Sequence, residues 1–137
     1  MKHNITDLTH EDIVSILSTA LYGCEWTVTD YDHEFYNNIK EHEGDCFEDA
    51  CADVLLNGGT ISIADSYAEG EIYGSKGKLC EDEETVVYTL DLQDFLKGCN
   101  SKGGFDLAVE ILVEEEGDYY TANDLLQIIM FGEVIYG

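Results

Sequence analysis

The stretch EHEGDCFEDACAD at residues 41–53 combines six carboxylates, two thiols and one imidazole with the start of an apolar helical pattern. Asp45 is a suitable N-cap for a helix that continues to Leu56, because its side-chain oxygen can accept a hydrogen bond from a free N–H of the first turn. The helical period predicts a buried face made of Phe47, Ala50, Cys51, Val54 and Leu55. The same period leaves three exposed charges, Glu48, Asp49 and Asp53.

Regular elements are predicted on the N-terminal side of this helix. Thr9 to Tyr22 opens with a capping box and carries apolar residues at helical spacing, so a helix is expected there. Glu25 to Asp30 alternates like a strand that buries Trp26 and Val28 on one face. Asp30 to Gly44 is polar and aperiodic, which predicts a loop with room for one helical turn.

On the C-terminal side, the period changes to that of strands and then returns to that of helices. Strands are predicted at Thr60 to Ala64, Glu71 to Tyr73 and Thr85 to Leu90. Helices are predicted from Asp91 to near Gly98, from Phe105 to Val113, and from Thr121 to Gly132.

The order of these elements predicts an α+β fold, in which a small, mainly antiparallel sheet packs against about four to five helices. The chain has 137 residues, no proline and no linker-like tract, so residues 1–137 are expected to form one domain. Hydrophobic residues make up 45% of the chain, which is too much apolar material for a disordered acidic segment. The apolar stretch from Ile128 to Tyr136 suits either a core or a dimer surface, so monomer and homodimer both stay open.

The composition is strongly acidic: thirty Asp and Glu accompany six Lys and no Arg, for a formal net charge of -24. Self-repulsion on this scale destabilises a compact state, and it exceeds what solubility requires of a small domain. Direct binding of nucleic acid is therefore disfavoured. A strongly basic partner, such as a nucleic-acid-binding protein, is expected instead.

Carboxylates gather at residues 30–34, 41–53, 65–84 and 110–118. Side chains two apart on a strand lie ~6.6 Å apart, and side chains four apart on a helix lie ~5 to 6 Å apart. Both distances are near the spacing of successive phosphates, so these acids could form a surface that mimics nucleic acid. Glu69 with Glu71 and Glu81 with Glu83 fit the strand spacing if their backbone is extended, and Asp49 with Asp53 fit the helical spacing. The candidate partner-binding residues are Glu48, Asp49, Asp53, Asp65, Glu69, Glu71, Glu81, Asp82, Glu83, Glu84, Glu114, Glu115 and Glu116.

A structural zinc ion is a second hypothesis, since His42, Cys46, Cys51 and Cys80 supply enough nitrogen and sulfur ligands for a tetrahedral site. Cys46 and Cys51 are about 140° apart around a helix, so both could bind one ion only if Cys46 precedes the helix. The alternative is that these cysteines are ordinary core or surface residues. No other cofactor is required.

The sequence contains no signature of an enzyme. A glycine-rich phosphate loop with its lysine, a nucleophile elbow and a paired-histidine metalloprotease motif are all missing, and no arginine is present to hold a substrate anion. Five cysteines, at positions 24, 46, 51, 80 and 99, lack the spacing of a disulfide framework, and neither a signal peptide nor a long apolar run is present. A non-enzymatic cytoplasmic protein with reduced thiols and no membrane span is expected.

Several segments resemble small acidic proteins that phages and mobile elements of Firmicutes encode. They are Thr9-His10-Glu11-Asp12-Ile13, Gly58-Gly59-Thr60, Tyr88 to Gly98, and Ile128 to Gly137. Among phage proteins of this size and charge, the chain is similar to the anti-CRISPR inhibitors of Cas9. The resemblance implies a setting of host defence in the cytosol of a bacterial host, and it implies no catalytic residue.

These observations predict an anti-CRISPR protein that binds a Cas9-type nuclease and blocks DNA loading or cleavage. Such nucleases hold their heteroduplex in basic channels and read the PAM with arginines, where an array of carboxylates would compete. One alternative keeps the mimicry and changes the target to a restriction enzyme or another DNA-binding protein. The other is a metal- or ligand-binding accessory protein whose acidity is incidental.

Overall fold

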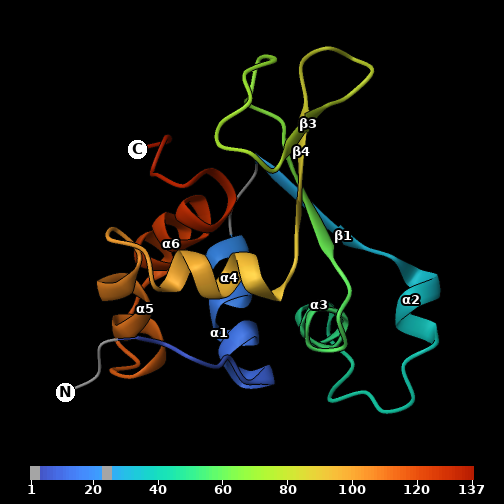
Figure 1. Cartoon of the computed structure of the whole chain (residues 1–137), viewed down its shortest axis with the longest axis vertical. Helices are drawn as coiled ribbons and strands as arrows, with labels where there is room; N and C mark the ends of the chain where they lie inside the picture. The colour runs from blue at the N-terminus through green and yellow to red at the C-terminus, as the bar shows by residue number, and fades with distance from the viewer. Residues whose placement is uncertain (1–3, 23–25) are drawn as a thin grey trace.

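The chain begins with a helix, a strand and two further helices, continues with three strands, and ends with three helices (Figure 1). The structure is a computed structural model that describes residues 4–22 and 26–137. The six helices described are α1 (His10–Leu21), α2 (His33–Asn37), α3 (Phe47–Leu56), α4 (Leu92–Cys99), α5 (Phe105–Leu112) and α6 (Tyr119–Phe131). The four strands are β1 (Thr27–Tyr31), β2 (Ile61–Asp65), β3 (Gly77–Leu79) and β4 (Val86–Leu90). The predicted α+β class is confirmed, with one more helix than the expected four to five.

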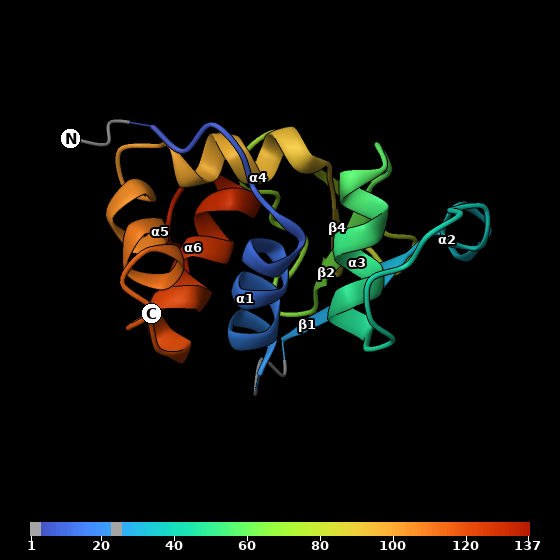
Figure 2. The same cartoon turned by 90° about the horizontal axis from the view of Figure 1, so that it is seen from below.

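The four strands form one antiparallel sheet in the order β1-β2-β4-β3. Its inner face carries the apolar alternation of β2 and β4, where Ile61, Ile63, Val86, Tyr88 and Leu90 are buried. Helix α3 lies against β1 and β2, and α4 lies against β4 (Figure 2). One face of the sheet therefore packs against the helices. On the opposite face, Val28, Ala64 and Val87 are paired in register and form a row across three strands.

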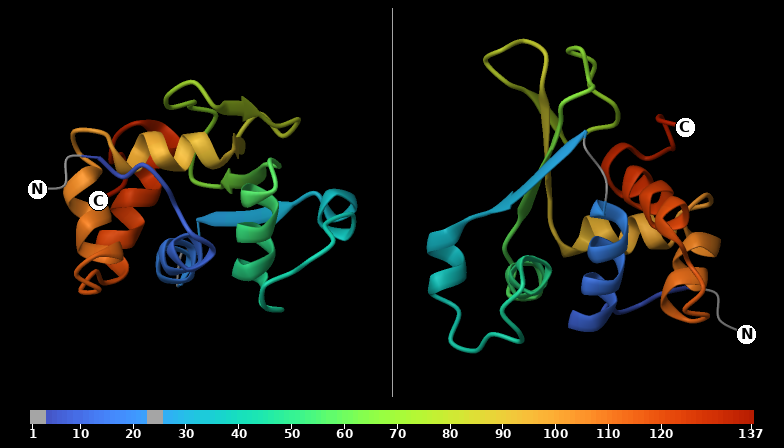
Figure 3. Two further views of the ribbon diagram at one scale, coloured as in Figure 1. Left: turned by 60° about the horizontal axis from the view of Figure 1, so that its bottom comes forward. Right: turned by 180° about the vertical axis from the view of Figure 1, so that it is seen from behind.

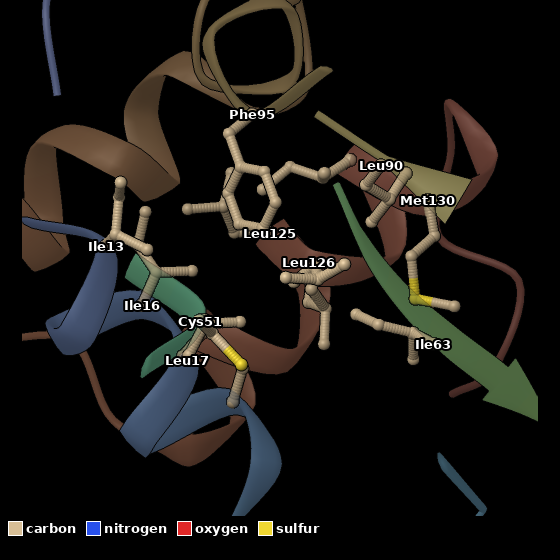
Figure 4. Packing of buried hydrophobic residues seen from close by; sticks show 14 of the residues in the cluster. Ile13, Ile16, Leu17, Cys51, Ile63, Leu90, Phe95, Leu125, Leu126 and Met130 are labelled. Carbon is tan, nitrogen blue, oxygen red and sulfur yellow. The ribbon is translucent and has the colours of Figure 1, made fainter. Parts of the chain in front are cut away.

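Helix α6 is the centre of the helical layer, because α1, α4 and α5 all pack on it. Its residues from Leu125 to Phe131 are buried, and they meet Ile13, Ile16 and Leu17 of α1 and Phe95 of α4 (Figure 4). Gly98 allows the close approach of α4, since a Cβ there would lie 2.5 Å from Cγ1 of Ile129. The stretch 128–131 is therefore core.

Several local predictions hold and others fail. The capping box of α1 is present, with Thr9 Oγ1 accepting from Asp12 N at 3.1 Å. Helix α3 begins one residue later than expected, with Cys46 rather than Asp45 at the N-cap and Phe47 40% exposed. Helix α6 begins at Tyr119, because Asp118 supplies the cap.

The strand predicted at residues 71–73 is not formed, and the short strand β3 lies at 77–79 instead. Lys78 of β3 pairs in register with Val87, so the sheet is extended by residues whose sequence resembles a turn. In β1, Val28 is 66% exposed, whereas Trp26 just before the strand is buried as predicted. The less exposed side of β1 is the side of Thr27, Thr29 and Tyr31, which are half-buried.

Candidate functional site

Two acidic loops project side by side from one end of the sheet (Figures 1 and 3). One connects β2 to β3 (residues 66–76) and the other connects β3 to β4 (residues 80–85). Gly70 N donates to Glu84 O at 2.8 Å, which fastens the first loop to the second. We call these two segments the acidic loop pair. Its six exposed carboxylates belong to Glu69, Glu71, Glu81, Asp82, Glu83 and Glu84.

Asp82 holds the second loop in shape. Its Oδ1 accepts from Glu84 N at 2.9 Å and from Thr85 N at 2.8 Å, and its Oδ2 accepts from Thr85 Oγ1 at 2.7 Å. These donors favour the charged form and lower the pKa of Asp82. The carboxylate at the centre of the turn is therefore ionised and fixed in position.

Three glutamates have a left-handed backbone, a conformation that costs an L residue other than glycine roughly 1–2 kcal/mol. Within the described residues they are the non-glycine residues with positive φ: Glu69 at 49°, Glu83 at 61° and Glu115 at 54°. All three belong to the predicted partner-binding set. Backbone strain of this kind is found at functional sites, so it motivates the hypothesis that these acidic turns contact a partner.

The predicted strand spacing of these acids is wrong. Glu69 and Glu83 lie in turns, so the pairs Glu69 with Glu71 and Glu81 with Glu83 are not two apart on extended backbone. Asp65 is also wrong as an exposed charge, because it has no exposed surface. It closes the end of β2 instead, where it accepts from Tyr67 N and from the hydroxyl of Tyr136.

The acids of α3 point toward the protein rather than away from it. The side chain of Asp53 is 5% exposed, and its Oδ1 lies 3.4 Å from Nε2 of His10. Asp49 Oδ1 lies 3.5 Å from the same nitrogen, and Oδ2 of Asp49 accepts from Cys46 N. Helical spacing of the two acids is thus correct, but the prediction that both are exposed is wrong. Glu48 is half-buried.

Sequence reasoning missed the cluster around Asp53, because its members come from α1, α3 and the loop before α3. His42 Nδ1 lies 3.3 Å from Asp53 Oδ2, and His10 Nδ1 lies 3.5 Å from Oε2 of Glu43. Beside them is an open pocket of about 660 Å³ that His10, Asp53 and Glu43 help to line. No local sequence signal marks this cluster, because the burial of Asp53 depends on its contact with His10 of α1.

A third acidic segment, Glu114 to Glu116, follows α5 and is exposed. Its backbone is turned back on the helix, with Glu114 N donating to Val109 O and Glu116 N donating to Glu110 O. It lies away from the acidic loop pair in Figure 1, next to α5. The structure therefore divides the predicted partner-binding residues between two separate surfaces, helix α3 with its cluster at Asp53, and the buried end of β2, where Asp65 lies.

The predicted zinc ligands are not assembled. Across residues 4–22 and 26–137, no group of three or more His, Cys, Asp or Glu side chains is arranged to hold a metal ion. Cys51 is fully buried in the core, where burial foremost raises the pKa of its thiol to about 12. Cys80 belongs to the β3–β4 loop, at the far end of the molecule from α3, which carries Cys51 and follows His42 and Cys46 (Figure 1).

Few positive charges offset the acidic surface. Among the described residues, one lysine forms an ion pair with a carboxylate: Lys76 Nζ lies 3.1 Å from Asp94 Oδ1. Asp94 also accepts from Asp91 N, so this pair belongs to the cap of α4. The carboxylates of the acidic loop pair have no such lysine partner in the part of the chain that the structure describes.

Comparison of the chain with protein-family models, with curated proteins and with solved structures gives no match. No helix among the described residues has the length and apolar character needed to cross a membrane.

Proposed function

We propose that the protein is an inhibitor that binds the nucleic-acid-binding surface of a basic protein through the acidic loop pair. The observation that carries this proposal is the juxtaposition of six exposed carboxylates on two loops joined by the Gly70–Glu84 hydrogen bond. Asp82 and the hydrogen bond between the loops hold their backbone in place, and a loop that is already ordered costs less to bind than a mobile one. The net charge of -24 adds long-range steering toward a basic partner.

The proposed partner is a Cas9-type nuclease, and binding would block DNA loading or cleavage. The support is the resemblance to small acidic phage proteins together with the basic channel and PAM-reading arginines of such nucleases. A restriction enzyme or another DNA-binding protein presents the same chemistry and is the alternative target. In each case the inhibitor acts by occupying a surface, and no reaction is involved.

The test is a pull-down of purified Cas9 followed by competition with target DNA, at low salt and at ~0.5 M salt, where screening shortens to a few ångströms. Retention at low salt, weakened at high salt, is expected. No retention at low salt would remove Cas9 as the target, and a pull-down from host lysate would then identify a different DNA-binding protein.

Two variants with equal charge change locate the surface. The loop variant carries Gln at Glu69, Glu71, Glu81, Glu83 and Glu84, and it keeps Asp82 because that residue shapes the turn. The control variant carries Gln at Glu11, Glu41 and Glu133 and Asn at Asp7 and Asp106, which are five exposed acids outside the predicted partner-binding set. Binding should weaken strongly in the loop variant alone. Equal weakening in both would mean that net charge, rather than the acidic loop pair, determines binding.

A further inference from the structure

We propose that the outer edge of β1 is a second contact surface, which pairs with an extended basic segment of the partner protein. The inference rests on the proposed function for the charge of the partner, and it adds the backbone geometry by which that partner is held. Strand addition to a free sheet edge is a common mode of peptide recognition, in which main-chain hydrogen bonds supply affinity.

Strand β1 is at the end of the sheet order, and its described pairing is with β2 alone. Ser66 N donates to Trp26 O at 2.9 Å, so residues 26 and 66 form a hydrogen-bonded pair. Hydrogen-bonded and non-hydrogen-bonded pairs alternate along an antiparallel ladder, so residues 26, 28 and 30 direct their N–H and C=O groups toward β2. Those of Thr29 and Tyr31 therefore point toward the open edge. The N–H of Tyr31 accordingly meets the side chain of its neighbour, Asp30 Oδ1, at 2.8 Å.

The two edges of the sheet differ in how they are protected. Natural edge strands are usually short or carry lysine, proline or a bulge, which prevents unwanted pairing. Strand β3 follows that rule with three residues and Lys78. Strand β1 has five residues and a one-to-one register with β2, and its single charged residue, Asp30, would repel an acidic segment but not a basic one. In the view from behind, no described helix or other strand lies in front of β1 (Figure 3, right).

The side chains around this edge specify the occupant. Val28 is 66% exposed on the outer face of the sheet, where it continues a row with Ala64 and Val87. Asp30 shares that face, and the exposed acids Asp32 and Glu34 follow it. A partner strand would therefore place an apolar residue beside Val28 and a basic residue beside Asp30. A second copy of this chain fits poorly, because each copy carries the same charge of -24.

The test compares two substitutions at Thr29. Thr29→Pro removes the outward N–H, which proline can do at a sheet edge without breaking the ladder to β2. Thr29→Ala removes the same side chain and keeps the N–H. The alanine change loses no hydrogen bond, since Thr29 Oγ1 is buried without a partner in the described structure. Circular dichroism and thermal melting first establish that both variants are folded.

The probe is a ten-residue peptide of alternating Arg and Val, titrated at low salt with amide shifts followed by NMR. Shifts at residues 27–31 are expected, with affinity at least about tenfold weaker for T29P than for T29A. Val28→Lys, a change at an exposed side chain, should weaken peptide binding as well. It replaces T29P as the test variant if T29P is unfolded. The inference would be overturned if T29P and V28K both bound the peptide as tightly as T29A does. It would also be overturned if the amide shifts were confined to the acidic loop pair.

Two further outcomes separate this inference from the function on which it rests. If T29P captures the partner protein as well as T29A does while the loop variant fails, the edge inference is wrong and the proposed function stands. If sedimentation shows a dimer that T29P dissociates, the edge pairs with a second copy and the basic segment is excluded. If the loop variant and T29P both capture the partner normally, both proposals fail.

Discussion

The hydroxyl of Tyr136 donates a 2.7 Å hydrogen bond to Oδ2 of Asp65, a carboxylate with no exposed surface. The two residues join the end of β2 to the segment that follows α6. The ring of Tyr136 also packs 5.0 Å, centroid to centroid, from that of Trp26, just before β1. This contact fixes the base of the first acidic loop, because Asp65 also accepts from Tyr67 N at 2.9 Å.

The Asp65→Asn variant should gain stability relative to the unsubstituted protein as the pH rises. Burial raises the pKa of Asp65, against the opposing effect of its hydrogen bonds from Tyr136 and Tyr67. The folded state therefore binds the proton of the Asp65 carboxyl group more tightly than the unfolded state does. The stabilisation that this gives is fully present below the ordinary pKa of aspartate, and it is lost as the pH rises through the raised pKa of the folded state. Asparagine keeps the shape and cannot ionise. Melting from about pH 3.5 to 7 should show the difference growing in favour of D65N; a constant difference would contradict this.

Tyr136→Phe should lower the free energy of unfolding by about 1.5–3 kcal/mol, the usual worth of a hydrogen bond to a charged group. The ring contacts with Trp26 and Phe131 stay, so the change isolates the hydroxyl. Urea unfolding measures the loss. In the D65N background the same substitution should cost less, and an equal cost in both backgrounds would argue against coupling of the two side chains.

His10→Ala should lower the free energy of unfolding by about 1–3 kcal/mol, because it removes a buried polar contact of Asp53, which keeps His42 and the N–H of Glu43 as partners. The double variant H10A/D53N removes the buried charge as well and should recover part of the loss. Urea unfolding of the two single variants and the double variant gives the coupling energy. Additive losses would show that the 3.4 Å contact contributes little.

The sequence predicted the elements whose signals are local, and it failed where the signal is tertiary. Helix α1 has its own capping box and apolar face, so its limits could be predicted closely. Whether Asp53 faces solvent depends on His10, 43 residues earlier, and no periodicity contains that information. The strand spacing predicted for Glu69 and Glu83 required extended backbone, but both residues lie in left-handed turns, and the second turn is held by hydrogen bonds to the side chain of Asp82. The exposure of Val28 follows from its place on the face of the sheet that the helices do not cover, which depends on the pairing and packing of distant elements.

Gln127→Met should release the segment after α6. The amide of Gln127 is fully buried; its Oε1 accepts from the N–H groups of Ile135 and Tyr136 at 2.9 and 2.8 Å, and its Nε2 donates to Tyr136 O. Methionine has a similar volume but leaves three backbone groups unpaired, at about 1–3 kcal/mol each if they stay buried. Hydrogen exchange at residues 135 and 136 should accelerate. Gln127→Glu retains the acceptors and should protect these amides better than methionine does.

Glu83→Gly tests the backbone strain separately from the charge. Glycine adopts a φ of 61° without the penalty that glutamate carries, and it adds roughly 0.5–1 kcal/mol of chain entropy to the unfolded state. The free energy of unfolding should therefore stay level or rise by up to about 1 kcal/mol, whereas Glu81→Gly, at a position without positive φ, should lower it. If Glu83 binds a basic partner through its charge, E83G and E83Q should weaken capture equally. Weaker capture by E83G than by E83Q would show that ordering of the turn, rather than its carboxylate alone, contributes to binding.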